Sequence, residues 1–98
     1  MIRVMYRWTV KNEDIEEFVQ TWEEGTLKIQ TQCAGAMGSI LLRSSDNSGH
    51  FFGMARWPSK EIWEAAQRTM PFLNLQGPKP ESEWFFDELV DIIPDLLE

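Results

Sequence analysis

The chain has 98 residues, 43% of them hydrophobic and 26% charged, and this size predicts one globular domain over residues 1–98. Sixteen acidic against nine basic residues give a net charge of −7, which argues against nucleic-acid and anionic-membrane partners, because both need a basic face. A single cysteine, Cys33, excludes an internal disulfide and cysteine-rich zinc sites. With no transmembrane span and no signal-peptide pattern in the sequence, we expect a cytoplasmic protein.

The first half of the chain predicts a strand, a helix and a second strand. Residues of more and less apolar character alternate over residues 2–10, which predicts a strand with one face more apolar than the other. We expect Asn12 to cap a helix whose apolar stripe ends near Cys33, with Gly35 as its C-cap. Gly25 lies inside this helix at a cost of roughly 1 kcal/mol relative to alanine, and marks close packing or a bend. Residues 37–43 predict the second strand.

The second half begins with a hairpin. A polar turn at residues 44–49 leads to a third strand over residues 50–57. Pro58 ends this strand because it lacks an N–H, and Ser59 is placed to cap a helix over residues 59–69 that stops at Pro71. We expect a loop over residues 72–81, with a short helical turn near Phe72. Residues 84–93 favour a strand by their aromatic and β-branched content, and a helix starting at Ser82 is the alternative.

The resulting order, β-α-β-β-α-β, predicts an α+β domain of the ferredoxin-like pattern: an antiparallel sheet with both helices on one face. The predicted strands carry apolar residues on both faces, so the face without helices needs a second cover. We expect a homodimer in which two sheets pack face to face.

Four arginines lie in the predicted strands. We expect them to pair with Asp87, Glu88 or Asp91, or to extend to the rim; an anion or carboxylate site is the alternative. They are Arg3, Arg7, Arg43 and Arg56.

Several reaction classes are excluded by what the sequence lacks. It contains no GxGxxG, P-loop or HExxH motif, and one histidine cannot build a multi-histidine metal site. We therefore expect no metal. We expect His50, beside the hairpin turn, to be a surface residue rather than a general base, and Cys33 to be a buried, unreactive thiol.

Aromatic side chains offer the best candidate site. Tyr6 and Trp8 share one face of the first strand, Phe18 and Trp22 lie on the stripe of the first helix, and Trp63 lies on the second helix. If they converge between sheet and helices, they form either a flat apolar cleft with phenol and indole donors, suited to a planar aromatic ligand, or a fully packed core. The sequence does not distinguish these two outcomes.

Three segments resemble the antibiotic biosynthesis monooxygenase family. They are Ile2-Arg3-Val4-Met5-Tyr6-Arg7-Trp8, Gly35-Ala36-Met37-Gly38-Ser39 and Ala55-Arg56-Trp57-Pro58-Ser59 leading to Trp63. The resemblance covers nearly the whole chain and implies the dimeric α/β barrel fold, with Trp57 as a structural residue. The family includes oxygenases of polycyclic aromatic substrates that use no metal or flavin, and haem-degrading enzymes.

The haem-degrading members use an Asn in the first strand, a Trp late in the second helix and a His beyond it. In this chain those positions fall near Tyr6 or Arg7 and near Ala66, and no histidine follows, so haem degradation is not expected. The resemblance instead implies a cofactor-independent monooxygenase for a small aromatic or quinol-type substrate. Tyr6, Arg7 and His50 are its weak catalytic candidates. The alternative is a non-catalytic homodimer that binds a small molecule or a partner through the same cleft.

Overall fold

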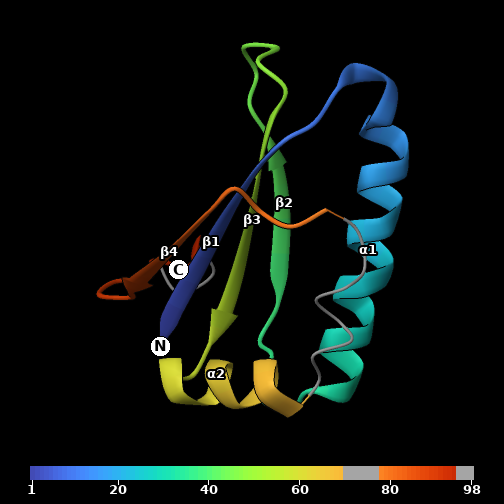
Figure 1. The fold of residues 1–98 in the computed structure, drawn as a ribbon. Coiled ribbons are helices and arrows are strands. Elements are labelled where there is room, and N and C mark those ends of the chain that lie inside the picture. The colour runs from blue at the N-terminus through green and yellow to red at the C-terminus, as the bar shows by residue number, and fades with distance from the viewer. Residues whose placement is uncertain (70–77, 95–98) are drawn as a thin grey trace.

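The computed structural model describes residues 1–69 and 78–94. Along the chain the elements are β1 (Ile2–Thr9), the 3-10 turn η1 (Asn12–Asp14), α1 (Ile15–Gln32), β2 (Ser39–Arg43), β3 (His50–Trp57), α2 (Lys60–Thr69) and β4 (Ser82–Asp87) (Figure 1). The strands form one antiparallel sheet in the order β2-β3-β1-β4. The predicted ferredoxin-like α+β architecture is thereby confirmed.

Both helices pack against the same face of the sheet. Figure 1 shows α1 running along the sheet and α2 crossing the end at which β1 begins. The alternation in β1 places its apolar residues under the helices, and the neighbouring β3 does the same. The buried side chains form two clusters. The cluster beneath α1 consists of Trp8, Val10, Phe18 and Phe51. The cluster toward α2 consists of Ile2, Val4 and Trp57.

The junction between β3 and α2 is formed as its local chemistry predicts. The Ser59 hydroxyl accepts a hydrogen bond from the Ile62 N–H at 3.2 Å and so satisfies one of the unpaired donors at the helix start. Trp57, just before Pro58, is 3% exposed at the end of β3. The strand therefore ends, and the helix begins, where the sequence indicated.

Two predicted caps of the first helix are wrong. Asn12 lies inside η1, and neither η1 nor α1 has a side-chain cap, because the 3-10 turn carries the chain into the helix. At the other end Cys33 is the capping residue, and its N–H donates to the Ile29 carbonyl at 2.9 Å. Gly35 instead lies where a Cβ would collide with Ile62 of α2, so it allows close approach of the two segments.

The boundaries of the second and last strands differ from the predicted ones. The second strand begins at Ser39 rather than Met37. The last strand spans Ser82–Asp87, so the region around Trp84 is a strand and not a helix, but residues 88–93 belong to neither. The expected helix stop at Pro71 and the turn near Phe72 lie outside the described residues.

The face of the sheet away from the helices, called here the outer sheet face, carries apolar side chains that the described residues cover only in part. Cross-strand register places the members together on one side. They are Met5, Ile40, Leu42, Phe52, Met54, Trp84 and Phe86, of which Ile40, Leu42, Trp84 and Phe86 are 39–51% exposed.

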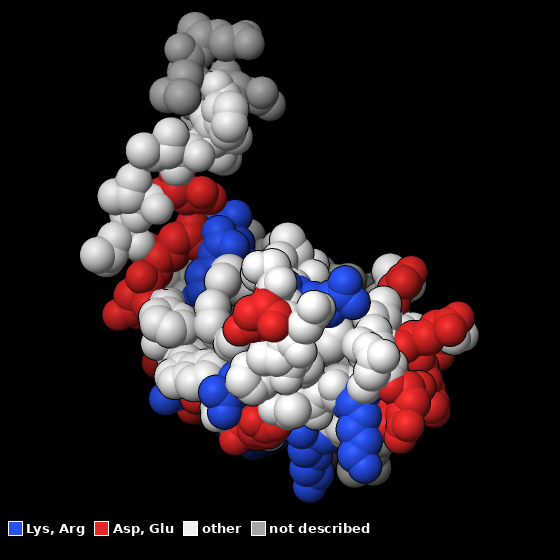
Figure 2. Space-filling view, turned by 90° about the horizontal axis from the view of Figure 1, so that it is seen from above, with Lys and Arg blue, Asp and Glu red and all other residues white. Residues whose placement is uncertain are grey.

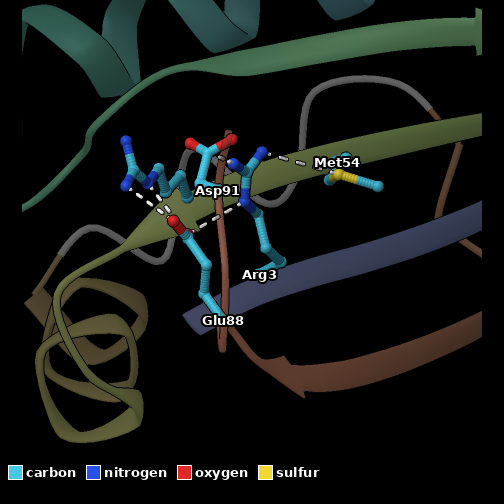
Figure 3. A network of polar contacts seen from close by, with 5 residues as sticks. Arg3, Met54, Glu88 and Asp91 are labelled. Carbon is cyan, nitrogen blue, oxygen red and sulfur yellow. Dashed lines mark hydrogen bonds and ion pairs between the residues drawn. The ribbon is translucent and has the colours of Figure 1, made fainter. Parts of the chain in front are cut away.

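Strand arginines at one end of this face are paired, as expected. Arg56 forms a two-point contact with Glu88, with Nη2 2.8 Å from Oε1, and the Arg3 Nε lies 3.2 Å from Oε2 (Figure 3). Arg3 also reaches Asp91 at 3.7 Å. Arg7 pairs with Glu81, a partner that the sequence reading did not name. The pairs made by Arg3 and Arg56 hold Glu88 and Asp91, which follow β4, beside the outer sheet face.

The charge distribution has no basic face in the view of Figure 2, where lysine and arginine side chains are scattered among acidic ones. Within residues 1–69 and 78–94, neither helix has the length and hydropathy needed to cross a membrane.

Candidate functional site

A cleft of about 430 Å³ opens between the sheet and the two helices. β1 and β3 form its floor, α1 and α2 form two walls, and residues 78–80 with β4 form another side. Tyr6 and Trp8 reach it from β1, Trp22 from α1 and Trp63 from α2. The cleft is therefore an open space with aromatic walls.

The floor of the cleft is open at Gly53, which pairs with Tyr6 across the strands and has no side chain. A Cβ at this position would lie 3.0 Å from the Trp8 ring and 3.3 Å from the Trp22 indole nitrogen, which is tighter than ordinary packing. Gly25, buried in α1, lines the opposite wall without a side chain. Two glycines on facing elements thus leave room for the indoles and for a ligand beside them.

Tyr6 and Trp63 are joined by a hydrogen bond that connects β1 to α2. The Trp63 indole N–H donates to the Tyr6 hydroxyl oxygen at 3.0 Å. Among the described residues the phenol O–H donates no hydrogen bond of its own. Tyr6 is therefore an oriented donor at the cleft surface.

The phenol of Tyr6 stays protonated well above neutral pH. Burial raises its pKa to about 12, since desolvation disfavours the phenolate. The Trp63 hydrogen bond acts in the opposite direction, and the negative charge of Glu83 on β4 adds to the increase. At physiological pH the group can donate a hydrogen bond but cannot act as a base.

Tyr6 is the one tyrosine of the chain, so its ionisation can be followed directly. We expect tyrosinate absorbance near 295 nm to appear with a midpoint near pH 12, whereas the unfolded chain should titrate near the usual value of about 10. Because the folded pKa is the higher one, folded-state stability should fall as pH rises between these two values. A midpoint near 10 in the folded protein would contradict the buried, hydrogen-bonded phenol; Tyr6→Phe gives the baseline.

Glu83 lies directly across from Tyr6, on β4. Burial raises the pKa of its carboxyl group, and the charge of Lys60 opposes that shift. Lys60 itself lies over the Phe85 ring, with Nζ 4.6 Å from the ring centroid, a cation–π contact. The Phe85 ring also meets Trp63 edge-on, which fixes this wall of the cleft.

Four of the five aromatic candidates meet at the cleft. Tyr6, Trp8, Trp22 and Trp63 line it, and Trp8 is anchored by an indole N–H that donates to the Pro78 carbonyl at 3.0 Å. Phe18 is 5% exposed and packs edge-on against Trp8, so it belongs to the core behind the cleft.

The two weak polar candidates lie elsewhere. Arg7 projects from the outer sheet face and pairs with Glu81 at 3.2 Å. His50 is the first residue of β3 and shares the outer register of Arg7 and Phe52, so it does not line the cleft either. Neither side chain is placed to act on a ligand in this cleft.

Sequence reasoning missed most of the other residues that line the cleft, and three of them stand out. Gly53 and Glu83 are both register partners of Tyr6, and Gln67 lies one helical turn after Trp63. The spacing from Trp63 could have indicated Gln67. The other two become visible only once the pairing of β1 with its neighbours is known.

The described residues contain no group of three histidine, cysteine, aspartate or glutamate side chains that could hold a metal. The chain's one histidine, His50, lies outside the cleft and cannot serve as a haem ligand there. Burial raises the pKa of the Cys33 thiol, which keeps this group protonated at neutral pH.

Comparison with known proteins gives one sequence-level match. The family model described as antibiotic biosynthesis monooxygenase matches residues 1–77. A search of curated protein sequences found no match.

Solved structures share the fold. One described as an antibiotic biosynthesis monooxygenase is 20% identical, with 96% of this chain and 100% of that chain covered and a TM-score of 0.60. A variant of MhuD with two manganese protoporphyrin IX molecules per active site is 16% identical, with 94% and 98% covered and a TM-score of 0.78. SnoaB, a cofactor-independent oxygenase from Streptomyces nogalater, is 18% identical, with 95% and 96% covered and a TM-score of 0.68. At these identities the likeness concerns the fold.

Proposed function

Because the chain belongs to the antibiotic biosynthesis monooxygenase family, we propose that it is a cofactor-independent monooxygenase for a small aromatic or quinol-type substrate. The supporting observation is the open cleft of about 430 Å³ with the oriented Tyr6 hydroxyl at its surface. A cleft filled by its own side chains would have favoured the alternative, a non-catalytic binding homodimer. SnoaB, which shares the fold, is described as a cofactor-independent oxygenase and gives the proposal a precedent.

The walls suit a planar aromatic substrate. Trp22 and Trp63 offer large apolar surfaces from the two helices, and flat rings pack well against them. The Tyr6 hydroxyl can then donate to an oxygen of the substrate. A donor aimed at a developing oxyanion stabilises the deprotonated substrate, and it does so best where water is partly excluded.

The deprotonated substrate supplies its own electrons to oxygen in this scheme. For a reactive CH₂ group of an anthrone-type ring the balance is one O₂ consumed, one new C=O formed and one water released. One oxygen atom enters the product, and the other leaves with the two hydrogens of the CH₂. The protein's part is to bind, to orient and to favour the anion.

Homodimerisation through the outer sheet face is part of the proposal. Four of its apolar side chains are 39–51% exposed, which is typical of a surface that another molecule covers. The segment after β4 adds Leu89, Val90 and Ile92, which are 69–89% exposed. A second copy provides an apolar surface of matching shape by symmetry.

Oxygen consumption over a panel of quinols and anthrones tests the enzymatic role. We expect turnover by the wild type and a loss of about 100-fold or more in kcat for Tyr6→Phe, the range seen when one oxyanion donor is removed. Trp63→Phe should lose less, about 10-fold, because the indole acts through the orientation of Tyr6.

Trp84→Phe is the matched control, since this indole lies on the outer sheet face away from the cleft. Equal rates for the wild type and Tyr6→Phe would remove Tyr6 from the chemistry. Absence of both turnover and tryptophan-fluorescence quenching with every compound would contradict the proposed substrate class.

A further inference from the structure

The cleft contains one carboxylate among its described lining residues, Glu83. Its other titratable lining groups are the Tyr6 phenol and the Lys79 ammonium. The remaining walls are apolar or carry neutral polar groups such as Gln67. A proton leaving a bound ligand therefore has few destinations, and their chemistry can be compared one by one.

Strand register places Glu83 beside the donor of the site. Tyr6 and Glu83 are directly opposed in the antiparallel pair β1–β4, and both project to the helix side. Side chains so opposed have Cβ atoms about 4.5–5.5 Å apart. One bound ring can thus meet the Tyr6 hydroxyl with one atom and the Glu83 carboxylate with a neighbouring one.

The surroundings of Glu83 leave its carboxylate available. Within the described residues Glu83 forms no ion pair. Lys60 of α2 lies over the Phe85 ring, and Arg7 pairs with Glu81, two residues before Glu83. The charged and titratable groups around it are Tyr6, Lys60 and Lys79. Glu83 is solvent-exposed, and the desolvation that its carboxyl group does experience raises its pKa, which strengthens it as a base.

We infer that Glu83 is the proton acceptor of the cleft and that it takes a proton from a weakly acidic C–H or O–H of a bound anthrone or phenol. In this step the bond to hydrogen breaks, its electron pair stays on the substrate as a delocalised anion, and the proton moves to a carboxylate oxygen of Glu83. No electron leaves the substrate, so the step needs no oxidant. The assignment rests on the proposed function and names the base that it requires.

Other candidate bases are less well placed. Arg7 and His50 lie outside the cleft. The pKa of Tyr6, raised to about 12, keeps the phenol protonated at neutral pH. Lys79 is a basic side chain, which would favour a substrate anion by its positive charge.

The step can be measured without oxygen. Under anaerobic conditions in D₂O, proton abstraction appears as deuterium incorporation into the CH₂ group of anthrone, followed by mass spectrometry. We expect the wild type to accelerate exchange over buffer and Glu83→Gln to lose about 100-fold or more of that acceleration. Anthrone affinity, measured by tryptophan-fluorescence quenching, should change little, and Glu83→Asp should recover part of the rate.

Glu81→Gln is the matched control, because this carboxylate is two residues away and pairs with Arg7 on the outer sheet face. It should exchange deuterium like the wild type. The wild-type exchange rate should also rise as pH increases through the elevated pKa of Glu83, and this rise should vanish in Glu83→Gln.

The outcomes separate the two proposals. Undiminished exchange in Glu83→Gln, with anthrone bound, would overturn the role of Glu83 and leave the oxygenase proposal standing. Oxygen consumption by a wild type that catalyses no anaerobic exchange would do the same. No binding of anthrone or of any phenol by the wild type would overturn both.

Discussion

Replacing Trp57 with alanine is expected to lower the free energy of unfolding by about 3–5 kcal/mol, the range for removing a large buried aromatic side chain. Trp57 is 3% exposed and belongs to the buried cluster with Ile2 and Val4. Its ring also lies 3.4 Å from the position that a Cβ on Gly35 would take, so it supports the segment between α1 and β2. Urea denaturation followed by circular dichroism measures the loss.

Two further variants make this result interpretable. Trp57→Phe keeps part of the ring and should lose less than Trp57→Ala, because a smaller cavity remains. Leu27→Ala, at a position 57% exposed on α1, should change stability by no more than about 0.5 kcal/mol. A loss below about 1 kcal/mol for Trp57→Ala would contradict the structural role of this indole.

The junction around Trp57 was predictable because its determinants are local. Pro58 lacks an N–H and Ser59 carries a short hydroxyl, and these properties act wherever the segment lies in the fold. The errors at Asn12 and Gly35 have the opposite origin. A 3-10 turn made Asn12 unnecessary as a cap, and contact with Ile62 of α2 determined the place of Gly35. The position of Gly35 depends on a neighbour that is distant in sequence, and the absence of a cap at Asn12 depends on the path by which the chain enters α1.

The residues of the candidate site likewise fall into those that a local sequence pattern indicates and those that only the packing or the strand register reveals. Alternation in β1 and spacing in the helices indicated Tyr6, Trp22 and Trp63, since one-sided patterns are visible in a single sequence. Phe18 and Trp22 lie on the same stripe of α1, one turn apart, and only packing assigns Phe18 to the core. Glu83 could not be found without the register of β1 and β4, because one residue of slip would turn its side chain to the outer sheet face.

A glutamate at Phe86 is expected to weaken dimerisation by about 100-fold or more, since an unpaired charge buried against a second sheet costs several kcal/mol. Phe86 lies on the outer sheet face and is 48% exposed within one chain. The substitution should leave the fold intact, because a position so exposed tolerates a polar side chain. Analytical ultracentrifugation should give twice the 11.5 kDa chain mass for the wild type and the single-chain mass for Phe86→Glu at micromolar concentration.

Leu27→Glu distinguishes a specific interface from a general response to added charge. It adds the same negative charge to an exposed apolar position, but on α1 rather than on the outer sheet face. This variant should remain dimeric, and both variants should keep the far-ultraviolet spectrum of the wild type. If Leu27→Glu dissociated and Phe86→Glu did not, the contact would lie on the helices. A monomeric wild type would contradict the proposed homodimer through the outer sheet face.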